Sequence, residues 1–161
     1  HPEVESARAV VRYSLSITCD DSAAFDLHVS ADERYEFRVN GQLVGRGPER
    51  GDASHWPFET YACEFSTGAH TLEILVWSAR DLRAYACNSV RHGLIVATDS
   101  EPWMARINTG TAKWRAQRLP GYEFTPPLQA WGTGGKLHFT ASGIKPEPPV
   151  AVQTLHPGIL W

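Results

Sequence analysis

The chain has 161 residues, 42% of them hydrophobic and 20% charged, and its formal net charge is −3. A chain of this length is most simply one domain, which buries about 70% of the surface of its unfolded state without disulfides or metals. The composition is that of an ordinary globular protein, and the charge gives neither a basic footprint for nucleic acid nor a polybasic patch for a membrane surface. No apolar run approaches the ~20 residues that a membrane-spanning helix needs.

Strand signals recur along the chain, whereas helix signals do not. The first run, residues 9–17, places Val11, Tyr13, Leu15 and Ile17 on one face, as in a half-buried strand. Similar runs predict further strands at residues 25–29, 35–39, 72–77, 93–97, 113–116 and 136–140. The run at 72–77 is apolar enough to indicate a central strand that is covered on both faces.

The segment from Tyr35 to Pro48 is the most informative part of the sequence. Alternating residues are followed by Asn40-Gly41, the dipeptide best suited to the positive φ angles of a two-residue type I′ hairpin turn. A hairpin closed there is predicted to pair Phe37 with Val44, and Tyr35 with Arg46. The loop that follows, residues 47–52, is the first place to look for function.

Short helical turns are predicted only at Ser78 to Ala86 and at Pro127 to Trp131. Many short strands separated by Gly and Pro predict an all-β fold, an antiparallel sandwich or barrel. From Gly143 onward the chain is rich in proline. We therefore expect a β-sandwich domain over residues 1–143, and over residues 144–161 an extended tail or linker toward a following domain.

The three cysteines, Cys19, Cys63 and Cys87, cannot all pair, and none lies in a C-x-x-C spacing. We predict that they serve as small buried hydrophobic residues. No secretory signal is recognisable, and the chain begins with His1 rather than methionine, so the compartment stays open.

No catalytic constellation stands out. The acidic residues are scattered, and no pair is marked by its spacing as the two carboxyl groups that a glycosidase needs. Gly-x-Ser-x-Gly is absent, the histidines never form an H-x-x-x-H zinc spacing, and residues 132–136 lack the full phosphate-loop frame. The sequence therefore predicts that this chain is not itself an enzyme.

Residues suited to holding a sugar are concentrated between residues 46 and 61. Aromatic faces pack against sugar C–H groups, and planar polar side chains hydrogen-bond hydroxyls. The candidate carbohydrate-binding residues are Arg46, Arg50, Asp52, His55, Trp56, Tyr61 and, in a later loop, Trp131. An alternative interpretation is structural, in which Trp56, Phe58 and Tyr61 plug one end of the sandwich and an Arg50–Asp52 ion pair braces the loop.

The other tryptophans divide into two groups by context. Trp77 and Trp114 stand in strand-like runs and are predicted to pack in the core or against another domain. Trp103 and Trp131 stand in loop-like contexts. If exposed, they are further candidates for a sugar platform or a docking contact.

Three segments resemble one family. Ser30 to Asp52 reads S-A-D-E-R-Y-E-F-R-V-N-G-Q-L-V-G-R-G-P-E-R-G-D, an aromatic-rich stretch follows at Trp56 to Tyr61, and a glycine turn leads into a strand at Ser66 to Ile74. Over roughly residues 8 to 120 this pattern resembles the N-terminal sandwich domain of bacterial α-L-rhamnosidase-like glycoside hydrolases. Ala69-His70 departs from it, because the family commonly has Gly-Asn there.

The resemblance implies a galactose-binding-like jelly-roll domain packed beside a separate helical catalytic barrel. The acidic catalytic residues would then lie in that barrel, outside this chain. Such sandwiches often carry a structural calcium, for which clustered carboxylates occur only at Asp20, Asp21, Glu49 and Asp52.

Three hypotheses remain open. The favoured one is a non-catalytic accessory domain of an α-L-rhamnosidase-like glycoside hydrolase, whose partners are carbohydrate and the catalytic domain of the parent chain. The alternatives are an autonomous, lectin-like carbohydrate-binding module and a purely structural interaction domain.

Overall fold

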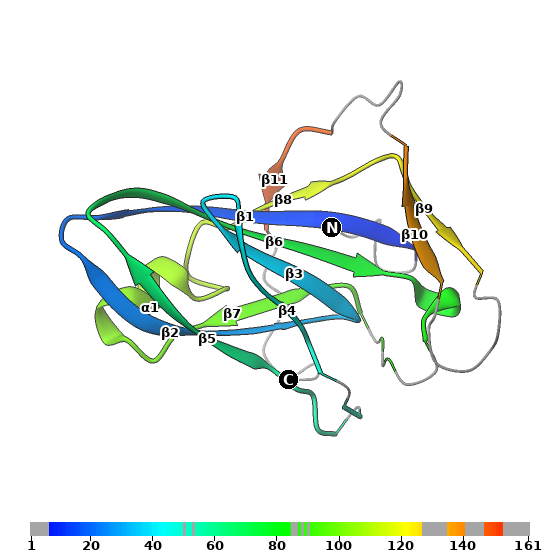
Figure 1. The fold of residues 1–161 in the computed structure, drawn as a ribbon, viewed down its shortest axis with the longest axis horizontal. Helices are drawn as coiled ribbons and strands as arrows, with labels where there is room; N and C mark the ends of the chain where they lie inside the picture. Colours follow the sequence, from blue (N-terminus) through cyan, green and yellow to red (C-terminus); the bar gives the residue numbers. More distant parts are fainter. Residues whose placement is uncertain are drawn as a thin grey trace.

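The computed structural model describes residues 7–49, 51–52, 54–84, 87, 89, 91–126, 135–140 and 147–152. Its strands are β1 (Ala9–Cys19), β2 (Ala23–Ala31), β3 (Arg34–Val39), β4 (Gln42–Gly47), β5 (Glu59–Phe65), β6 (Gly68–Ser78), β7 (Leu94–Ala97), β8 (Arg115–Arg118), β9 (Tyr122–Thr125), β10 (Lys136–Phe139) and β11 (Val150–Ala151). A 3-10 turn, η2 (Arg80–Leu82), and a short helix, α1 (Glu101–Ile107), complete these elements (Figure 1).

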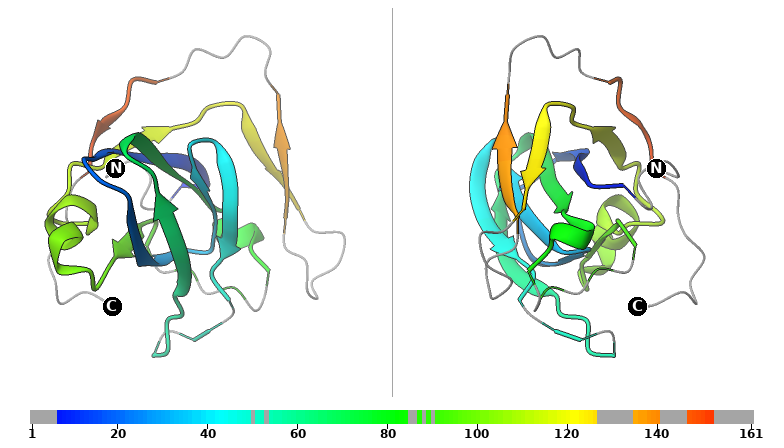
Figure 2. Two further views of the ribbon diagram at one scale, coloured as in Figure 1. Left: turned by 60° about the vertical axis from the view of Figure 1, so that its left-hand side comes forward. Right: turned by 90° about the vertical axis from the view of Figure 1, so that its right-hand side faces the viewer.

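The strands form two antiparallel layers. The large sheet has the order β11-β8-β1-β6-β3-β4, and the small sheet has the order β5-β2-β7. The two sheets face each other as a sandwich, while β9 and β10 form a separate hairpin at one end (Figures 1 and 2). The prediction of an all-β antiparallel sandwich is confirmed.

The core lies between the two sheets and is built by alternation along the strands. Leu27 and Val29 of β2 are fully buried, as are Tyr35 and Phe37 of β3. Strand β6 contributes every second residue from Leu72 to Val76. These inward positions are apolar because this face of each strand is withdrawn from water, a gain of roughly 25 cal/mol per Å² of apolar surface.

Strand β6 is central, as predicted, because it pairs with β1 on one side and with β3 on the other. Its inward residues are buried, and its outward residues, Glu73, Leu75 and Trp77, are only half-buried. The second face of this strand is therefore less covered than its apolar sequence indicated.

The predicted turn between β3 and β4 is confirmed, because Asn40 has φ 50° and Gly41 has φ 78°. The predicted pairing is wrong beyond Arg38. A bulge makes Val44 the extra residue, so Phe37 lies opposite Gly45. Gly45 is needed there, since a Cβ atom at this position would lie 2.1 Å from Cε1 of Tyr61.

The one-residue shift in pairing that the bulge introduces continues to the end of the hairpin. Tyr35 lies opposite Gly47 rather than opposite Arg46, and Arg46 instead faces Glu36. A β-bulge also bends its strand and interrupts regular pairing, which makes an edge strand such as β4 a poor template for aggregation.

We predict that Gly41→Val destabilises the protein by about 1–2 kcal/mol, the cost of a left-handed conformation for an L-residue. No atom lies within 4 Å of the added Cβ, so the cost comes from the backbone conformation alone. Chemical denaturation measures it, with Gln42→Val as the control at an ordinary φ. Equal stability of the two variants would contradict the turn.

Helix α1 was not predicted. Its sequence signal is Ser100 at the N-cap followed by Pro102 in the first turn. Trp103 therefore lies on a helix rather than in a loop, and its ring stacks on Phe25 with the centroids 5.0 Å apart. The Arg106 guanidinium covers the same indole, 4.3 Å from its centroid.

The remaining predictions have mixed outcomes. Turn η2 falls within the segment predicted to hold a helical turn, whereas Pro127 to Trp131 lies outside the described residues. Strand β11 lies in the stretch predicted as a tail and pairs with β8. The division into domain and tail stays a prediction. Among the described residues, no helix has the length and apolar character that crossing a membrane requires.

Cys19 and Cys63 are buried thiols, as predicted, and Cys87 is half-buried; all three are free. Burial raises the pKa of the Cys63 thiol to about 11 and also raises that of Cys19. Both thiols are therefore protonated at neutral pH and behave as small hydrophobic side chains.

Candidate functional site

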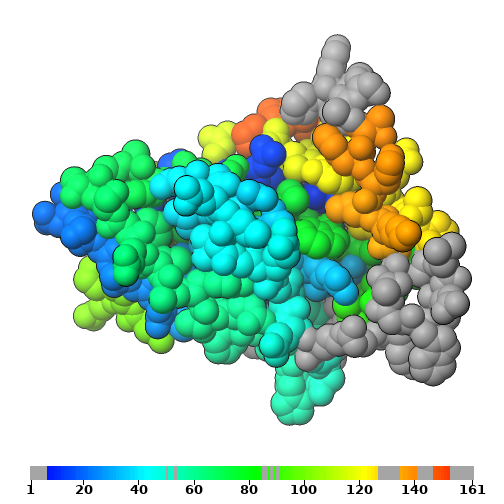
Figure 3. All heavy atoms as spheres, in the orientation of Figure 1, coloured from blue at the N-terminus to red at the C-terminus, as the bar shows by residue number. Residues whose placement is uncertain are grey.

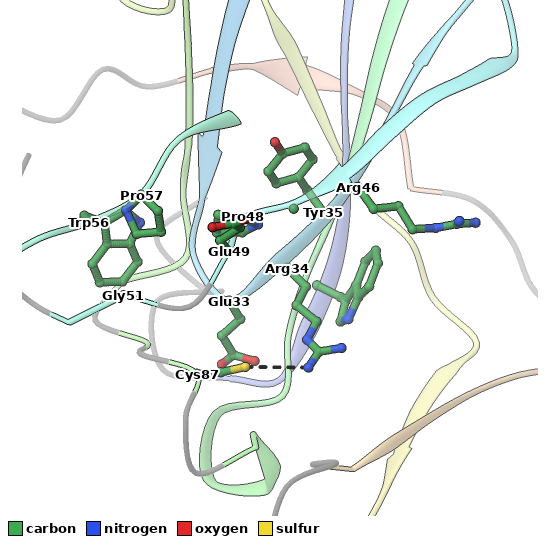
Figure 4. Close-up of a pocket in the computed structure, with 12 residues that line it drawn as sticks. Glu33, Arg34, Tyr35, Arg46, Pro48, Glu49, Gly51, Trp56, Pro57 and Cys87 are labelled. Carbon is green, nitrogen blue, oxygen red and sulfur yellow. Dashed lines mark hydrogen bonds between the residues drawn. The ribbon is translucent and has the colours of Figure 1, made fainter. Parts of the chain in front are cut away.

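A pocket of about 300 Å³ opens where β3 begins, and where β4 ends and the chain leaves for β5 (Figure 4). Two indoles, Trp56 and Trp77, line it together with Tyr35. Its charged lining residues are Glu33, Arg34, Arg46 and Glu49. This segment between β4 and β5 projects from the body of the molecule (Figure 3).

One wall of the pocket is the loop from Gly47 to Pro57. Two glycines permit its close packing. A Cβ atom on Gly47 would lie 2.7 Å from Oη of Tyr35, and one on Gly51 would lie 2.4 Å from the carbonyl oxygen of His55. The Gly47-Pro48 peptide bond is cis. The missing side chain at Gly47 therefore lets the chain approach Tyr35, and the missing side chain at Gly51 lets it approach His55.

Asp52 and His55 brace this loop from outside. The Asp52 carboxylate accepts the amide hydrogens of Ser54 at 2.7 Å and His55 at 2.9 Å, and it lies 3.0 Å from Nδ1 of the His55 ring. The His55 ring lowers the pKa of Asp52. Both side chains are exposed, at 83% for His55 and 66% for Asp52, so they act on the fold of the loop and not on the pocket.

The opposite wall comes from the large sheet. Arg34 on β3 lies opposite Trp77 on β6, so the two side chains are neighbours on the outward face. Nη2 of Arg34 lies 3.7 Å from Sγ of Cys87, which also lines the pocket (Figure 4). A cation and an indole thus stand side by side at this wall.

Tyr35 forms the base of the pocket and is held in place by Tyr61. The Tyr35 hydroxyl donates to the carbonyl oxygen of Val29 at 3.2 Å and lies 3.0 Å from the Tyr61 hydroxyl. The Tyr61 hydroxyl in turn reaches the carbonyl oxygen of Arg46 at 3.2 Å. Burial raises the pKa of both phenols, so they remain protonated donors.

Arg46 lines the pocket but is already engaged with Glu36. Its Nη2 lies 2.9 Å from Oε2 of Glu36, and Arg38 contacts the other oxygen at 2.6 Å. Burial alone would raise the pKa of Glu36, but the two guanidinium groups hold it below its ordinary value. Arg46 is 64% exposed, so this pair contributes little to stability.

Glu33, which lines the pocket, has a positive φ of 67°, and its carboxylate reaches the amides that follow β6. It accepts the amide hydrogens of Ala79 and Arg80, the second at 2.8 Å. Burial raises the pKa of this carboxyl. Glu33 is thus committed to capping the turn η2.

Asp32, Ser78 and His92 have the residue types of a hydrolase triad but not its arrangement. The Ser78 hydroxyl donates to Oδ2 of Asp32 at 3.0 Å and lies 2.8 Å from Nδ1 of His92. The serine therefore stands between the acid and the histidine, whereas a triad places the histidine in the middle. All three are buried, and burial lowers the pKa of His92 to about 3. We interpret the set as a structural network.

The structure brings together only some of the residues predicted to bind sugar. Arg46 and Trp56 line the pocket, Tyr61 contacts the lining residue Tyr35, and Asp52 and His55 are exposed and do not line it. Arg50 and Trp131 lie outside the described residues. Lining residues that the sequence did not indicate are Glu33, Arg34, Tyr35, Trp77 and Cys87.

The calcium suggested by the resemblance finds no fitting cluster. In the ranges that the structure describes, no three side chains of His, Cys, Asp or Glu come together as ligands of a metal ion. Calcium takes six to eight oxygen ligands. Asp20, Asp21, Glu49 and Asp52 are therefore not assembled into such a site.

No protein-family model and no curated protein matches the sequence. Among solved structures, the chain is similar to the GH78 family rhamnosidase of Bacillus sp. GL1, with a TM-score of 0.69 and 23% identity. The match covers 85% of this chain and 15% of the rhamnosidase chain. The chain shares the fold of that segment. A GH2 beta-galacturonidase from Eisenbergiella tayi matches with a TM-score of 0.34 and 11% identity, over 99% of this chain and 31% of that one.

Proposed function

We propose that this chain is a non-catalytic β-sandwich accessory domain of an α-L-rhamnosidase-like glycoside hydrolase, which supports the catalytic domain and contacts carbohydrate. The observation that carries the sugar contact is the pocket between Trp56 and Trp77. The shared fold with a small segment of a rhamnosidase supports the accessory role.

The chemistry of the pocket suits a sugar. Its volume of about 300 Å³ lies at the lower end of the range for small-ligand sites and is enough for a short saccharide. The indoles of Trp56 and Trp77 offer flat apolar faces for C–H groups. The Arg34 guanidinium offers several hydrogen-bond donors in one plane for sugar oxygens. The Glu49 carboxylate offers acceptors for sugar hydroxyls.

A supporting rather than catalytic role agrees with the carboxyl groups present. Retaining and inverting glycosidases both need two carboxyl groups that face one sugar. Two carboxyl groups line the pocket, but Glu33 is buried and already bound to backbone amides. Glu49 is exposed. We therefore expect no hydrolysis of aryl glycosides by the purified chain.

Calorimetric titration with oligosaccharides, alongside an aryl-glycoside assay, tests this proposal. Trp56→Ala should weaken sugar binding about 3- to 10-fold, as expected for the loss of one aromatic contact. Phe58→Ala is the matched control, because this ring is exposed two residues away and does not line the pocket. Robust hydrolysis, or no sugar binding at all, would contradict the proposal.

An autonomous carbohydrate-binding module is the second candidate. It is favoured by one observation, namely that two indoles and the Arg34 guanidinium already line the pocket. Binding by the isolated chain as tight as binding by the full-length parent protein would favour the module. Binding that requires the neighbouring domain would favour the accessory role.

A further inference from the structure

The outward face of the large sheet is basic, although the whole chain is acidic. The outward-facing charged residues on the strands of this sheet are five arginines and two glutamates. They are Arg12, Arg34, Arg38, Arg46, Arg115, Glu36 and Glu73. The outward charged residues of the small sheet are acidic, namely Asp26 and Glu64. The charge of the molecule is thus divided between its two faces, and the pocket opens at the end of the basic one.

Among the described residues, three of these five arginines have a carboxylate within ion-pair distance, and Arg34 and Arg115 do not. Glu36 serves both Arg38 and Arg46, and Glu73 lies 3.8 Å from Arg12. The Arg34 guanidinium contacts the sulfur of Cys87. Within the described ranges, no carboxylate lies within 4.0 Å of this guanidinium. Among the described residues, Arg34 is therefore the guanidinium of the pocket wall that has no carboxylate within ion-pair distance.

We propose that the pocket takes a carboxylated sugar, a uronic acid residue whose carboxylate pairs with Arg34. The inference rests on the proposed function, because it names the class of sugar that the same pocket holds. A guanidinium matches a carboxylate with two parallel hydrogen bonds. Trp77, directly opposite Arg34 on the neighbouring strand, places an indole face beside the carboxylate site for the sugar ring.

The two carboxyl groups of the pocket do not oppose this assignment. The Glu33 carboxylate already accepts hydrogen bonds from the amides of Ala79 and Arg80. Glu49 is exposed to solvent, which screens its charge, and it remains an acceptor for sugar hydroxyls. The basic face beyond Arg34 raises the local concentration of an anionic saccharide.

The test compares three trimers by calorimetry: glucuronic acid, its methyl ester and glucose. The ester keeps the ring, length and linkage and removes only the charge. We expect the acid to bind about tenfold more tightly than the ester, because the ester cannot form the charge-assisted hydrogen bonds with Arg34. Added salt should weaken binding of the acid and leave binding of the ester unchanged.

Arg34→Gln should reduce the affinity for the acid to that for the ester. Arg38→Gln is the matched control, because Arg38 lies on the same strand and face, pairs with Glu36 and does not line the pocket. It should leave the preference intact. A preference that survives Arg34→Gln, or that Arg38→Gln removes equally, would overturn the assignment.

The two proposals fail separately. Equal binding of acid, ester and glucose trimers would contradict the selection of a carboxylate and leave the carbohydrate contact standing. If none of the three trimers binds, the carbohydrate contact and the carboxylate selection are both wrong.

Discussion

Phe37→Ala should lower the free energy of unfolding by about 3–5 kcal/mol, the usual cost of deleting a buried aromatic side chain. Phe37 is fully buried on β3, and its ring centroid lies 5.4 Å from that of Tyr61. Because small domains are stable by only about 5–15 kcal/mol, this one change removes a large part of the total. Urea denaturation measures the loss.

Phe58→Ala deletes the same atoms at a site where the ring is 61% exposed. Its effect should stay within about 0.5 kcal/mol, as for most surface substitutions. Equal losses for the two variants would mean that the inward face of β3 is not the core of the sandwich.

Acidification from pH 7 to pH 5 should destabilise the protein through His92. This imidazole has an ordinary pKa of 6.5 when the chain is unfolded, and burial, with the charge of Arg80, lowers its pKa to about 3 in the folded state. Between these values only the unfolded state binds the proton. The stability is therefore full above pH 6.5 and falls by roughly 1.4 kcal/mol per pH unit as the pH drops toward 3.

The expected loss between pH 7 and pH 5 is about 2 kcal/mol more in the wild type than in His92→Gln. The raised pKa of Glu33 acts in the opposite direction, but it is common to both proteins and cancels in the difference. His55→Gln, at an exposed ring, should leave the pH dependence unchanged. Should His92→Gln fail to fold, an NMR titration of the wild type replaces it, and protonation of His92 above pH 5 would contradict the account.

The layered fold could be predicted from the sequence because alternation of apolar residues is a local signal. The inward residues of β1 and β3 lie where the pattern placed them. The turn at Asn40-Gly41 was equally predictable, since few residue pairs tolerate two positive φ angles.

The details that depend on contacts between distant segments were not predictable. The bulge at Val44 accompanies the close packing of Gly45 against the ring of Tyr61, which belongs to another sheet. Arg34 and Trp77 meet only through the register of β3 on β6. Neither residue was marked as part of a site, although Arg34 stands inside the stretch that resembles the rhamnosidase-like family.

The charge was the least informative global property. A net charge of −3 describes the whole chain, but the described strands give the outward face of the large sheet an excess of arginines and leave the outward charged residues of the small sheet acidic. Only the sheet pairing shows which charges share a face, because residues far apart in sequence become neighbours there.

The most direct test of the carbohydrate contact is an NMR titration of the tryptophan indole N–H signals with the glucuronic acid trimer. Trp114 provides an internal reference, because it is buried and its indole nitrogen donates to the carbonyl oxygen of Ile107 at 2.8 Å. We predict saturable shifts of the Trp56 and Trp77 signals and none for Trp114. Unmoved Trp56 and Trp77 signals at millimolar trimer would contradict a sugar site in this pocket.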